Sequence, residues 1–313
     1  MKYDIVCSTK NLSTEEWLKM RTIGIGGSDA SIIAGCNPYC SIFELWQEKR
    51  GEIPVKEEES EVIHFGKVLE DVVRKEFIQR TGLMVRKKNS ILRSKEYPFM
   101  IADLDGVVSE FDGTYSIFEA KTAIEFKNND WKNGEIPKAY QLQVQHYLAV
   151  TGFQKAYIAV LVGGNKFYWT EVYRDEQLIK MLVSMESHFW HCVREGEEPD
   201  VDASKATSLY LGAKYNNAKV GSVIDLDEQM LSAIEKYEQI KIELDSLTEQ
   251  KRLVENQLKS ALAENEAGRV GGHIVKWKQV VQTRIDSSKL KEKHKDIYDD
   301  CKKEVIYRKF SVA

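Results

Sequence analysis

Ile101-Ala102-Asp103-Leu104-Asp105-Gly106 and Phe118-Glu119-Ala120-Lys121-Thr122 are the two stretches that decide the fold of this chain. Their alternating apolar residues predict two strands, Met100–Glu110 and Tyr115–Lys121, joined by a turn at Asp112-Gly113. An acidic residue on one strand and Glu-x-Lys on the next is how a metal-dependent nuclease arranges its carboxylates and its ammonium group. The pattern is weak alone, because Glu-x-Lys is also common on solvated strands of a chain with 30% charged residues.

The length of the turn decides whether these side chains meet. A two-residue loop would place Asp105 and Glu119 on opposite faces of the sheet, because successive side chains on a strand alternate in direction. A three-residue loop, Asp112-Gly113-Thr114, would bring both carboxylates and Lys121 to one face. The nuclease hypothesis therefore predicts an odd-numbered loop or a compensating bulge.

Length and composition indicate a soluble globular protein. With 313 residues and 42% hydrophobic residues, the chain is long and apolar enough for one large domain with an appendage. No segment approaches the ~20 apolar residues of a membrane span. The N-terminal segment has no apolar stretch typical of a signal peptide, so we expect a cytoplasmic protein that does not associate with a membrane.

The five cysteines are scattered, which favours free thiols. Some nucleases hold an iron–sulfur cluster on four cysteines, but no compact ligand motif occurs here. Cys36-x-x-x-Cys40 also differs from the spacing of a zinc ribbon.

The formal net charge of −4 argues against a protein that coats nucleic acid by bulk electrostatics, but it is compatible with a local basic cleft. Acidic residues gather elsewhere, for example in Glu57-Glu58-Glu59. The basic residues that flank the acidic motif are Arg86-Lys87-Lys88, Arg93, Lys95, Lys127, Lys132 and Lys138. A solvated face is an equally good interpretation of these charges.

Two further segments hold candidate site residues. Gly24 to Asp29 is a glycine-rich turn in which we expect Ser28 to cap a helix, and with Arg21 nearby it forms either a small anion site or a tight connector. Phe65–Arg80 is an amphipathic helix with Glu70 at the edge of its apolar face. A carboxylate there needs a metal or a cationic side chain as its partner.

The remaining elements predict an α/β fold. A helix from Pro137 to Thr151 carries Gln143, and strands Lys155–Val162 and Lys166–Tyr173 follow. With a last helix to Glu195, this order predicts a mixed sheet with helices on both faces.

A different organisation begins near residue 222. Apolar residues spaced three and four apart predict a long helix with a coiled-coil seam, followed by a small hairpin and a short helix over 287–298. The seam consists of Tyr237, Ile240, Leu244, Leu247, Val254, Leu258 and Ala261, interrupted by Lys251. We expect a nuclease domain over residues 1–215 and a C-terminal helical extension over 222–313.

Several motifs in order resemble the YqaJ-type viral recombinase family, one of the PD-(D/E)xK nuclease families, over roughly residues 13–195. They are Trp17 and Leu18 before Arg21, Gly27-Ser28-Asp29-Ala30, Asn37-Pro38-Tyr39, Phe43-Glu44-Leu45-Trp46, Phe65-Gly66-Lys67 through Glu70, Asp105-Gly106, Glu119-x-Lys121 and Gln143-Val144-Gln145-His146. The resemblance implies a restriction-endonuclease-like core and an exonuclease that resects one strand of linear duplex DNA from its 5′ end. It also implies Mg²⁺, for which Mn²⁺ can substitute, a toroidal homotrimer, and a single-strand annealing recombinase as partner.

The resemblance also assigns roles by position. Asp105 and Glu119 would bind metal together with the backbone carbonyl of Ala120, and Glu70 would hold a metal or its water. Lys121 would act on the attacking water in a two-metal phosphodiester hydrolysis.

The outer parts of the site follow in the same way. Gln143 would support the metal centre, while Arg21 and Ser28 would recognise a terminal 5′-phosphate. The chain departs from the family at Asp103, which adds a negative charge beside Asp105 and is either a supporting group or a surface residue.

Two alternatives remain at this stage. A related RecB-like or Cas4-like nuclease would have the same cutting chemistry with endonuclease activity or opposite polarity, although no cysteine cluster supports the Cas4 version. A non-catalytic DNA-end-binding scaffold would use the coiled coil as its main working part.

Overall fold

The computed structural model describes residues 2–55, 60–305 and 307–312 of two compact units, Met1–Lys214 and Tyr215–Ala313. The acidic run Glu57-Glu58-Glu59 lies outside the described residues. None of the helices within the described ranges is both long and apolar enough to cross a membrane. All five cysteines are free thiols.

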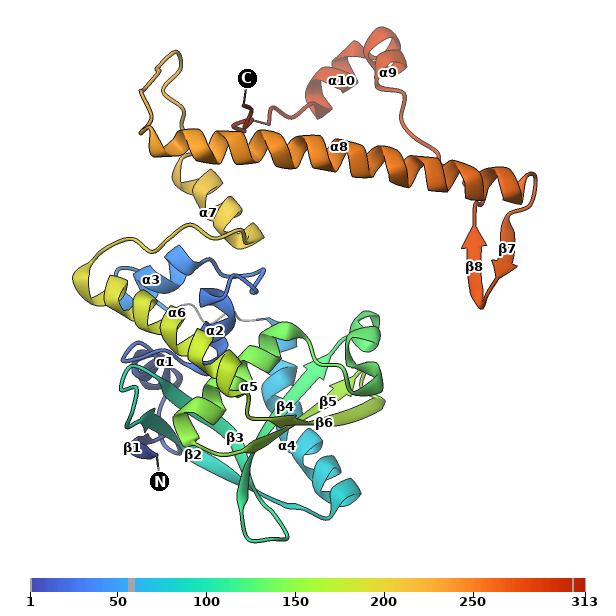
Figure 1. The fold of residues 1–313 in the computed structure, drawn as a ribbon. Coiled ribbons are helices and arrows are strands. Elements are labelled where there is room, and N and C mark those ends of the chain that lie inside the picture. The colour runs from blue at the N-terminus through green and yellow to red at the C-terminus, as the bar shows by residue number, and fades with distance from the viewer. Residues whose placement is uncertain (1, 56–59, 306, 313) are drawn as a thin grey trace. The chain divides into compact units, whose positions relative to one another are not determined.

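A mixed sheet of six strands forms the centre of the first unit (Figure 1). In spatial order the strands are β1 (Tyr3–Ser8), β2 (Met84–Ser94), β3 (Ile101–Ser109), β4 (Tyr115–Ala123), β5 (Lys155–Val162) and β6 (Lys166–Tyr173). Only β4 and β5 run parallel, and the crossover between them contains η1 (Glu125–Gly134) and α5 (Lys138–Thr151). The expected α/β class is therefore confirmed, although β1 was not predicted.

Helices cover both faces of this sheet. α4 (Glu61–Thr81) packs Val73 and Phe77 against Phe118, whereas α5 packs Val144 and Leu148 against the opposite face. The neighbours Ile117 and Phe118 on β4 therefore enter different hydrophobic clusters. Burial on both sides makes β4 and β5 almost wholly apolar where they cross the core, so the charged residues of β4 at its C-terminal half stand out.

The remaining helices of this unit are α1 (Thr14–Arg21), α2 (Gly27–Ile33), α3 (Ile42–Arg50), α6 (Glu176–Glu195) and α7 (Lys205–Lys214). Ser13 and Glu16 form a capping box at the start of α1. The expectation that Ser28 caps α2 is wrong, because the helix begins at Gly27 and its cap is Gly26. The Asp29 side chain reaches back to the Gly26 amide at 2.8 Å, which leaves the Ser28 hydroxyl to contact Arg21.

The β3–β4 turn has the odd length that the nuclease hypothesis requires. Ser109 pairs with Tyr115 and Gly106 pairs with Phe118, which places Asp105 and Glu119 at facing positions. The loop is Phe111-Asp112-Gly113, one residue earlier than expected, because the Glu110 amide donates to the Thr114 carbonyl and closes the ladder there. The loop has three residues, as predicted, and this number decides which side chains of the two strands share a face of the sheet.

The second unit is built on one long helix. α8 (Gln229–Leu262) is followed by the hairpin β7 (Ala267–Val270) and β8 (His273–Lys276). The single short helix expected over 287–298 is two helices, α9 (Ser287–Lys293) and α10 (Lys295–Cys301), because the backbone leaves the helical region at His294.

Close packing of α2 on α5 predicts that Gly27→Ala lowers the free energy of unfolding by about 1–3 kcal/mol. A Cβ atom on Gly27 would lie 2.4 Å from Tyr147 Cε1 and 3.0 Å from Gln143 Cγ. Urea denaturation measures the difference. Gly212→Ala on α7 is the matched control, since a Cβ atom added to Gly212 would meet open space. Its stability should stay the same or rise by up to about 1 kcal/mol. Equal losses in the two variants would contradict the tight contact.

Candidate active site

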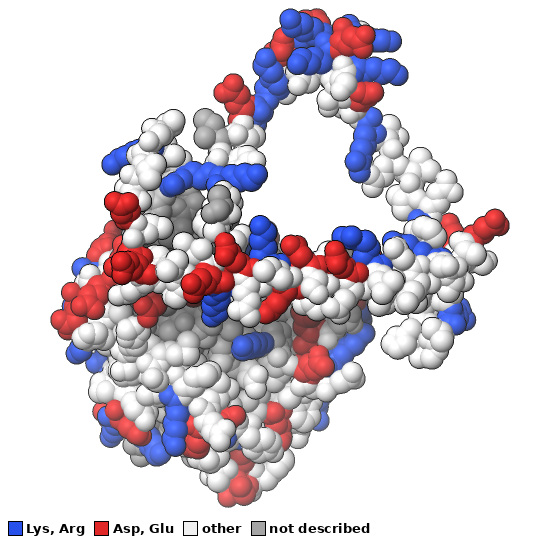
Figure 2. All heavy atoms as spheres, turned by 45° about the horizontal axis from the view of Figure 1, so that its top comes forward, with Lys and Arg blue, Asp and Glu red and all other residues white. Residues whose placement is uncertain are grey.

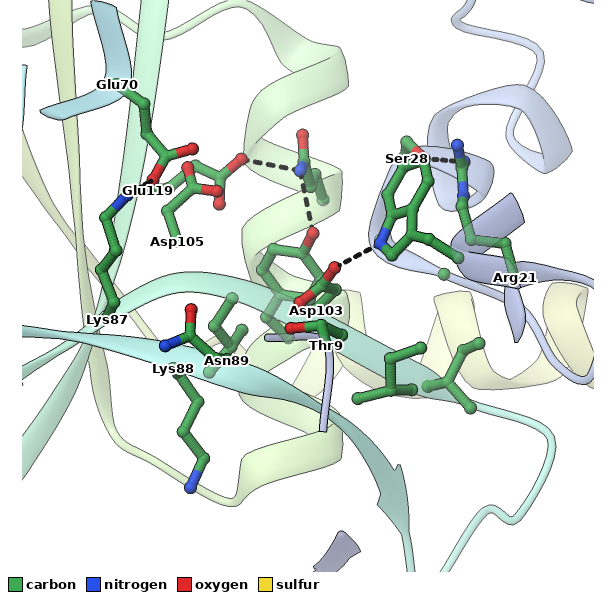
Figure 3. Close-up of a pocket in the computed structure, with 18 residues that line it drawn as sticks. Thr9, Arg21, Ser28, Glu70, Lys87, Lys88, Asn89, Asp103, Asp105 and Glu119 are labelled. Carbon is green, nitrogen blue, oxygen red and sulfur yellow. Dashed lines mark hydrogen bonds and ion pairs between the residues drawn. The ribbon is translucent and has the colours of Figure 1, made fainter. Parts of the chain in front are cut away.

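A cavity of about 390 Å³ gathers most of the predicted site residues (Figure 3). The predicted residues that line it are Arg21, Ser28, Glu70, Asp105, Glu119 and Gln143. Lys121 lies beside them through its contact with Glu119. The residues come from α1, α2, α4, α5, β3 and β4, so only the folded chain brings them together.

Glu119 is the most deeply buried of the three carboxylates, with 2% of its surface exposed. Its Oε1 accepts hydrogen bonds from Lys121 Nζ at 2.6 Å and Gln143 Nε2 at 2.8 Å. Its Oε2 is buried without a hydrogen-bond partner among the described atoms. A buried, unsatisfied carboxylate oxygen is costly, which makes this atom a natural ligand for a cation.

Asp105 sits across the β3–β4 ladder and is held by the backbone. Its Oδ2 accepts from the Ala120 amide at 2.8 Å. The predicted metal contact of Ala120 involves its carbonyl oxygen, so the observed hydrogen bond uses the other polar group of that peptide. Figure 3 shows the Glu70, Asp105 and Glu119 side chains turned toward one another.

Gln143 and the tyrosines around it orient the ammonium group. Lys121 Nζ lies 3.1 Å from Gln143 Oε1 and 4.7 Å from the centroid of the Tyr140 ring. Gln143 Nε2 also donates to Tyr147 Oη at 3.1 Å. The amide thus fixes Glu119 and Lys121 at the same time, which is a physical reason for a glutamine at this position of α5.

Glu70 faces the pocket from α4, and its partner is a lysine. Lys87 Nζ on β2 lies 3.3 Å from Glu70 Oε1 and 2.8 Å from Asp71 Oδ1. The salt-bridge alternative left open for Glu70 therefore occurs in the structure. In the sequence Lys87 stands out only as part of a basic run, because a contact between α4 and β2 has no local signature.

The electrostatics of the pocket follow from burial of like charges. Burial raises the pKa of Asp105 to about 7, and the nearby Glu119 adds to this effect. Burial also raises the pKa of Glu119 and, together with Asp105, the pKa of Glu70. Burial acts to lower the pKa of Lys121, but Glu119 and Asp105 outweigh it and raise that pKa. The pocket therefore holds excess negative charge that a cation would relieve.

The predicted anion site lies at the other end of the same cavity. Arg21 Nη2 donates to Ser28 Oγ at 2.9 Å, and its guanidinium stacks 5.1 Å from the centroid of the Trp17 ring. Trp17 Nε1 donates to Asp103 Oδ2 at 2.8 Å. Asp103 is partly buried and lines the cavity, so the interpretation as a surface residue is wrong. Trp17 lines the cavity and was missed as a site residue.

A buried ion pair holds Arg21 and the start of α2 in place. Asp29 is 2% exposed, and its Oδ2 lies 2.6 Å from Lys49 Nζ on α3, while Arg21 Nη2 lies 3.5 Å from Oδ1. Burial acts to raise the pKa of Asp29, but Lys49 and Arg21 outweigh it and hold the pKa below its ordinary value. Lys49 also donates to the Arg21 carbonyl oxygen at 2.7 Å, so α1, α2 and α3 share one charged centre.

The basic residues expected near the motif are only partly gathered at the cavity. Lys87 and Lys88 line it, whereas Lys95 pairs with Asp4 and Lys127 with Asp130 on the surface. On the face shown in Figure 2, basic and acidic side chains are interspersed. The basic character of the site is therefore local.

The donor set of the cavity fits a hard divalent cation. Carboxylate and backbone oxygens are the ligands that Mg²⁺ and Mn²⁺ prefer, and Glu119 Oε2 has no partner among the described atoms. Within residues 2–55, 60–305 and 307–312, no three His, Cys, Asp or Glu side chains are already placed to hold a metal. Lys87 contacts Glu70 Oε1 and Lys121 contacts Glu119 Oε1, and Glu119 Oε2 has no such contact among the described atoms.

Comparisons with known proteins agree with the motifs. A family model described as the YqaJ-like viral recombinase domain matches residues 16–154. The uncharacterized protein YqaJ of Bacillus subtilis (strain 168) is 42% identical over 312 residues, which cover 99% of this chain and 97% of that protein.

Two solved structures are similar over 58% of this chain. An alkaline exonuclease (LHK-Exo) from Laribacter hongkongensis is covered to 94%, with 20% identity and a TM-score of 0.49. A phage related exonuclease from Haemophilus somnus 129PT is covered to 100%, with 15% identity and a TM-score of 0.41.

The buried pair predicts that Lys49→Met lowers the free energy of unfolding by about 3 kcal/mol or more at neutral pH, because it leaves Asp29 buried without its main partner. Denaturant titration measures the loss. The matched control is Lys95→Met, whose partner Asp4 is 70% exposed, and it should cost less than about 1 kcal/mol. Comparable losses would contradict the central position of Asp29.

The same pair predicts a dependence on pH. Since the folded-state pKa of Asp29 is lowered, its stabilisation is present above the ordinary value of 3.8 and disappears as pH falls through the folded-state pKa. The difference in unfolding free energy between wild type and Lys49→Met should therefore shrink in acid. A constant difference would show that Asp29 is not the group involved.

Proposed function

This chain belongs to the YqaJ-like viral recombinase family, and on that premise we propose that it is a DNA exonuclease that resects linear duplex DNA in phage-type recombination. The observation that carries this proposal is the convergence of three carboxylates, a lysine and a glutamine at one end of a cavity whose other end carries an arginine and a serine. We further propose 5′-to-3′ polarity. The trimer and the annealing recombinase remain proposals based on family resemblance.

The metal would be Mg²⁺, with Mn²⁺ as a substitute, held by Glu70, Asp105 and Glu119 and the carbonyl oxygen of Ala120. Divalent ions at such a site activate water and stabilise the leaving 3′-oxygen. Support comes from the raised carboxyl pKa values and from the unpartnered Glu119 Oε2. The positive charge of a bound cation would balance the negative charge of the carboxylates, which Lys87 and Lys121 balance in the structure.

Lys121 is suited to a position beside the scissile phosphate. Its Nζ is fixed by Glu119 and Gln143 and stays charged at neutral pH, since its pKa is raised. With a cation held by Glu119, this ammonium group would orient the attacking water and offset negative charge on the phosphate.

Arg21 and Ser28 are suited to a terminal phosphate. A guanidinium and a hydroxyl form a donor pair for phosphate oxygens. The Trp17 ring packs against the Arg21 guanidinium and restricts its movement. Gly26 and Gly27, at the start of α2, line the same end of the cavity. A site that binds a terminal phosphate close to the carboxylates that would hold the metal favours exonuclease action over cutting within a strand.

Two alternatives make different predictions. A RecB-like or Cas4-like endonuclease would use the same carboxylates and would also cut circular DNA. A DNA-end-binding scaffold would bind ends without turnover, but it has no need of a buried carboxylate cluster that faces Lys121.

The first prediction concerns turnover. Wild-type protein with Mg²⁺ should degrade one strand of linear duplex DNA, faster with a 5′-phosphate, and should leave circular DNA intact. EDTA should abolish the reaction, and Lys121→Ala should slow it at least about 100-fold through loss of charge stabilisation. Gel analysis of end-labelled strands gives rate and polarity.

Lys127→Ala is the control for this assay, because its side chain is 62% exposed and pairs only with Asp130 among the described contacts. It should keep the wild-type rate. Cutting of circles would support the endonuclease, and absence of cutting by wild-type protein with either metal would support the scaffold.

The second prediction concerns metal binding without turnover. Mg²⁺ or Mn²⁺ should raise the thermal midpoint of the wild-type protein, because a ligand that binds only the folded state stabilises it. Asp105→Asn should remove this shift. Asp112→Asn, in the exposed β3–β4 loop, should keep it. A metal-induced shift that survives Asp105→Asn would place the metal elsewhere.

A further inference from the structure

The long helix α8 presents an apolar seam that is exposed along its length. Leu244, Leu247 and Val254 are 58%, 60% and 53% exposed, although they repeat with the spacing of a coiled coil. Leu262 is the buried residue of this helix among those described. Exposure of so many large apolar side chains in regular order indicates a surface that is covered by a partner.

We propose that α8 pairs with α8 of a second copy of this chain, as an antiparallel two-stranded coiled coil. This interaction is independent of the proposed nuclease activity. The seam reads as a heptad repeat with Tyr237, Leu244, Lys251 and Leu258 at position a and Ile240, Leu247, Val254 and Ala261 at position d. A helix of 34 residues is roughly 50 Å long and carries more than four heptads, which is enough for a stable pair.

Lys251 decides the direction of the pairing. In a parallel dimer each a position faces the same residue of the other copy, so two Lys251 ammonium groups would meet inside the seam. Parallel pairing would also place Lys236 at position g opposite Lys241 at position e of the other copy. Both contacts bring like charges together, which is unfavourable.

Antiparallel pairing removes these conflicts. Each a position then faces a d position, and with the two helices in full overlap Leu244 faces Leu247 of the second copy. Lys251 faces Ile240 of the second copy, so its stem covers an apolar residue while its Nζ stays 3.5 Å from Glu255 of its own helix. The residues beside the seam also avoid like pairs, since Lys241 comes to face Thr248 of the second copy.

The chain itself leaves this seam open. The β7–β8 hairpin covers the end of α8, where Gly268 lies next to Leu262, and Trp277 lies near Lys259. At the other end Phe310 touches the edge of the Tyr237 ring, which remains 40% exposed. Between these contacts, from Ile240 to Leu258, the apolar seam residues are exposed, so the described residues leave this part of the seam open to a second copy.

The test measures the mass of the full-length protein by sedimentation equilibrium. Leu244→Lys with Leu247→Lys should lower the mass of the wild-type assembly to that of the assembly which the first unit forms by itself, a monomer or the proposed trimer. The matched control is Ile242→Lys with Leu253→Lys, because these side chains are 70% and 61% exposed on α8 but lie outside the seam. The control should keep the wild-type mass. A wild-type protein that stays monomeric at tens of micromolar, or equal masses in all three proteins, would overturn the proposal.

Disulfide trapping tests the direction. In a Cys301→Ser background, which removes the exposed thiol, Ile240→Cys with Lys251→Cys should form covalent dimers on oxidation. Each single variant should not form covalent dimers. In an antiparallel pair residue 240 of one copy lies roughly 16 Å along the axis from residue 240 of the other, and the same holds for residue 251. Cross-linking of the single variants would overturn the antiparallel arrangement. Circular dichroism of each variant confirms that α8 remains helical.

Discussion

The first unit depends on one constraint, the burial of several carboxylates at one side of a sheet. Glu119 is almost fully buried, and Asp105 faces it across the β3–β4 ladder. Such an arrangement is costly unless positive charge and hydrogen-bond donors surround it. Lys121, Gln143 and the Ala120 amide supply them from β4 and α5. The crossover through α5 is therefore part of the site as well as part of the core, since its apolar residues hold the sheet while Gln143 faces the carboxylates.

A second buried charge organises the other end of the cavity. Asp29 joins α2 to α3 through Lys49 and to α1 through Arg21. The guanidinium is thereby held between a buried carboxylate, a serine hydroxyl and the Trp17 ring. Trp17 in turn donates to Asp103 on β3. The phosphate-binding end and the carboxylate end that we propose are thus connected through side chains that line one cavity, which would fix the distance between a DNA end and the bond that is cut.

The second unit follows a different physical rule. Its long helix buries little surface within the chain, so its apolar seam is explained by association and its polar interruption at Lys251 by a preferred direction of pairing. Binding chemistry and assembly would then reside in separate units of the chain. This separation lets each be altered without the other, which is why variants in α8 and variants in the cavity test independent proposals.

The sequence by itself determined the elements whose signals are local. Strands β5 and β6 were predicted with their observed bounds. The β3–β4 loop has the odd length that the nuclease hypothesis required for Asp105 and Glu119 to share a face. Periodicity, capping residues and turn residues act over a few positions, so they can be read from the chain. Only the tertiary structure decided the partners of the charged groups. Lys87 with Glu70, Trp17 with Asp103 and Lys49 with Asp29 join residues far apart in sequence, and such contacts depend on how the elements pack, for which no local pattern exists.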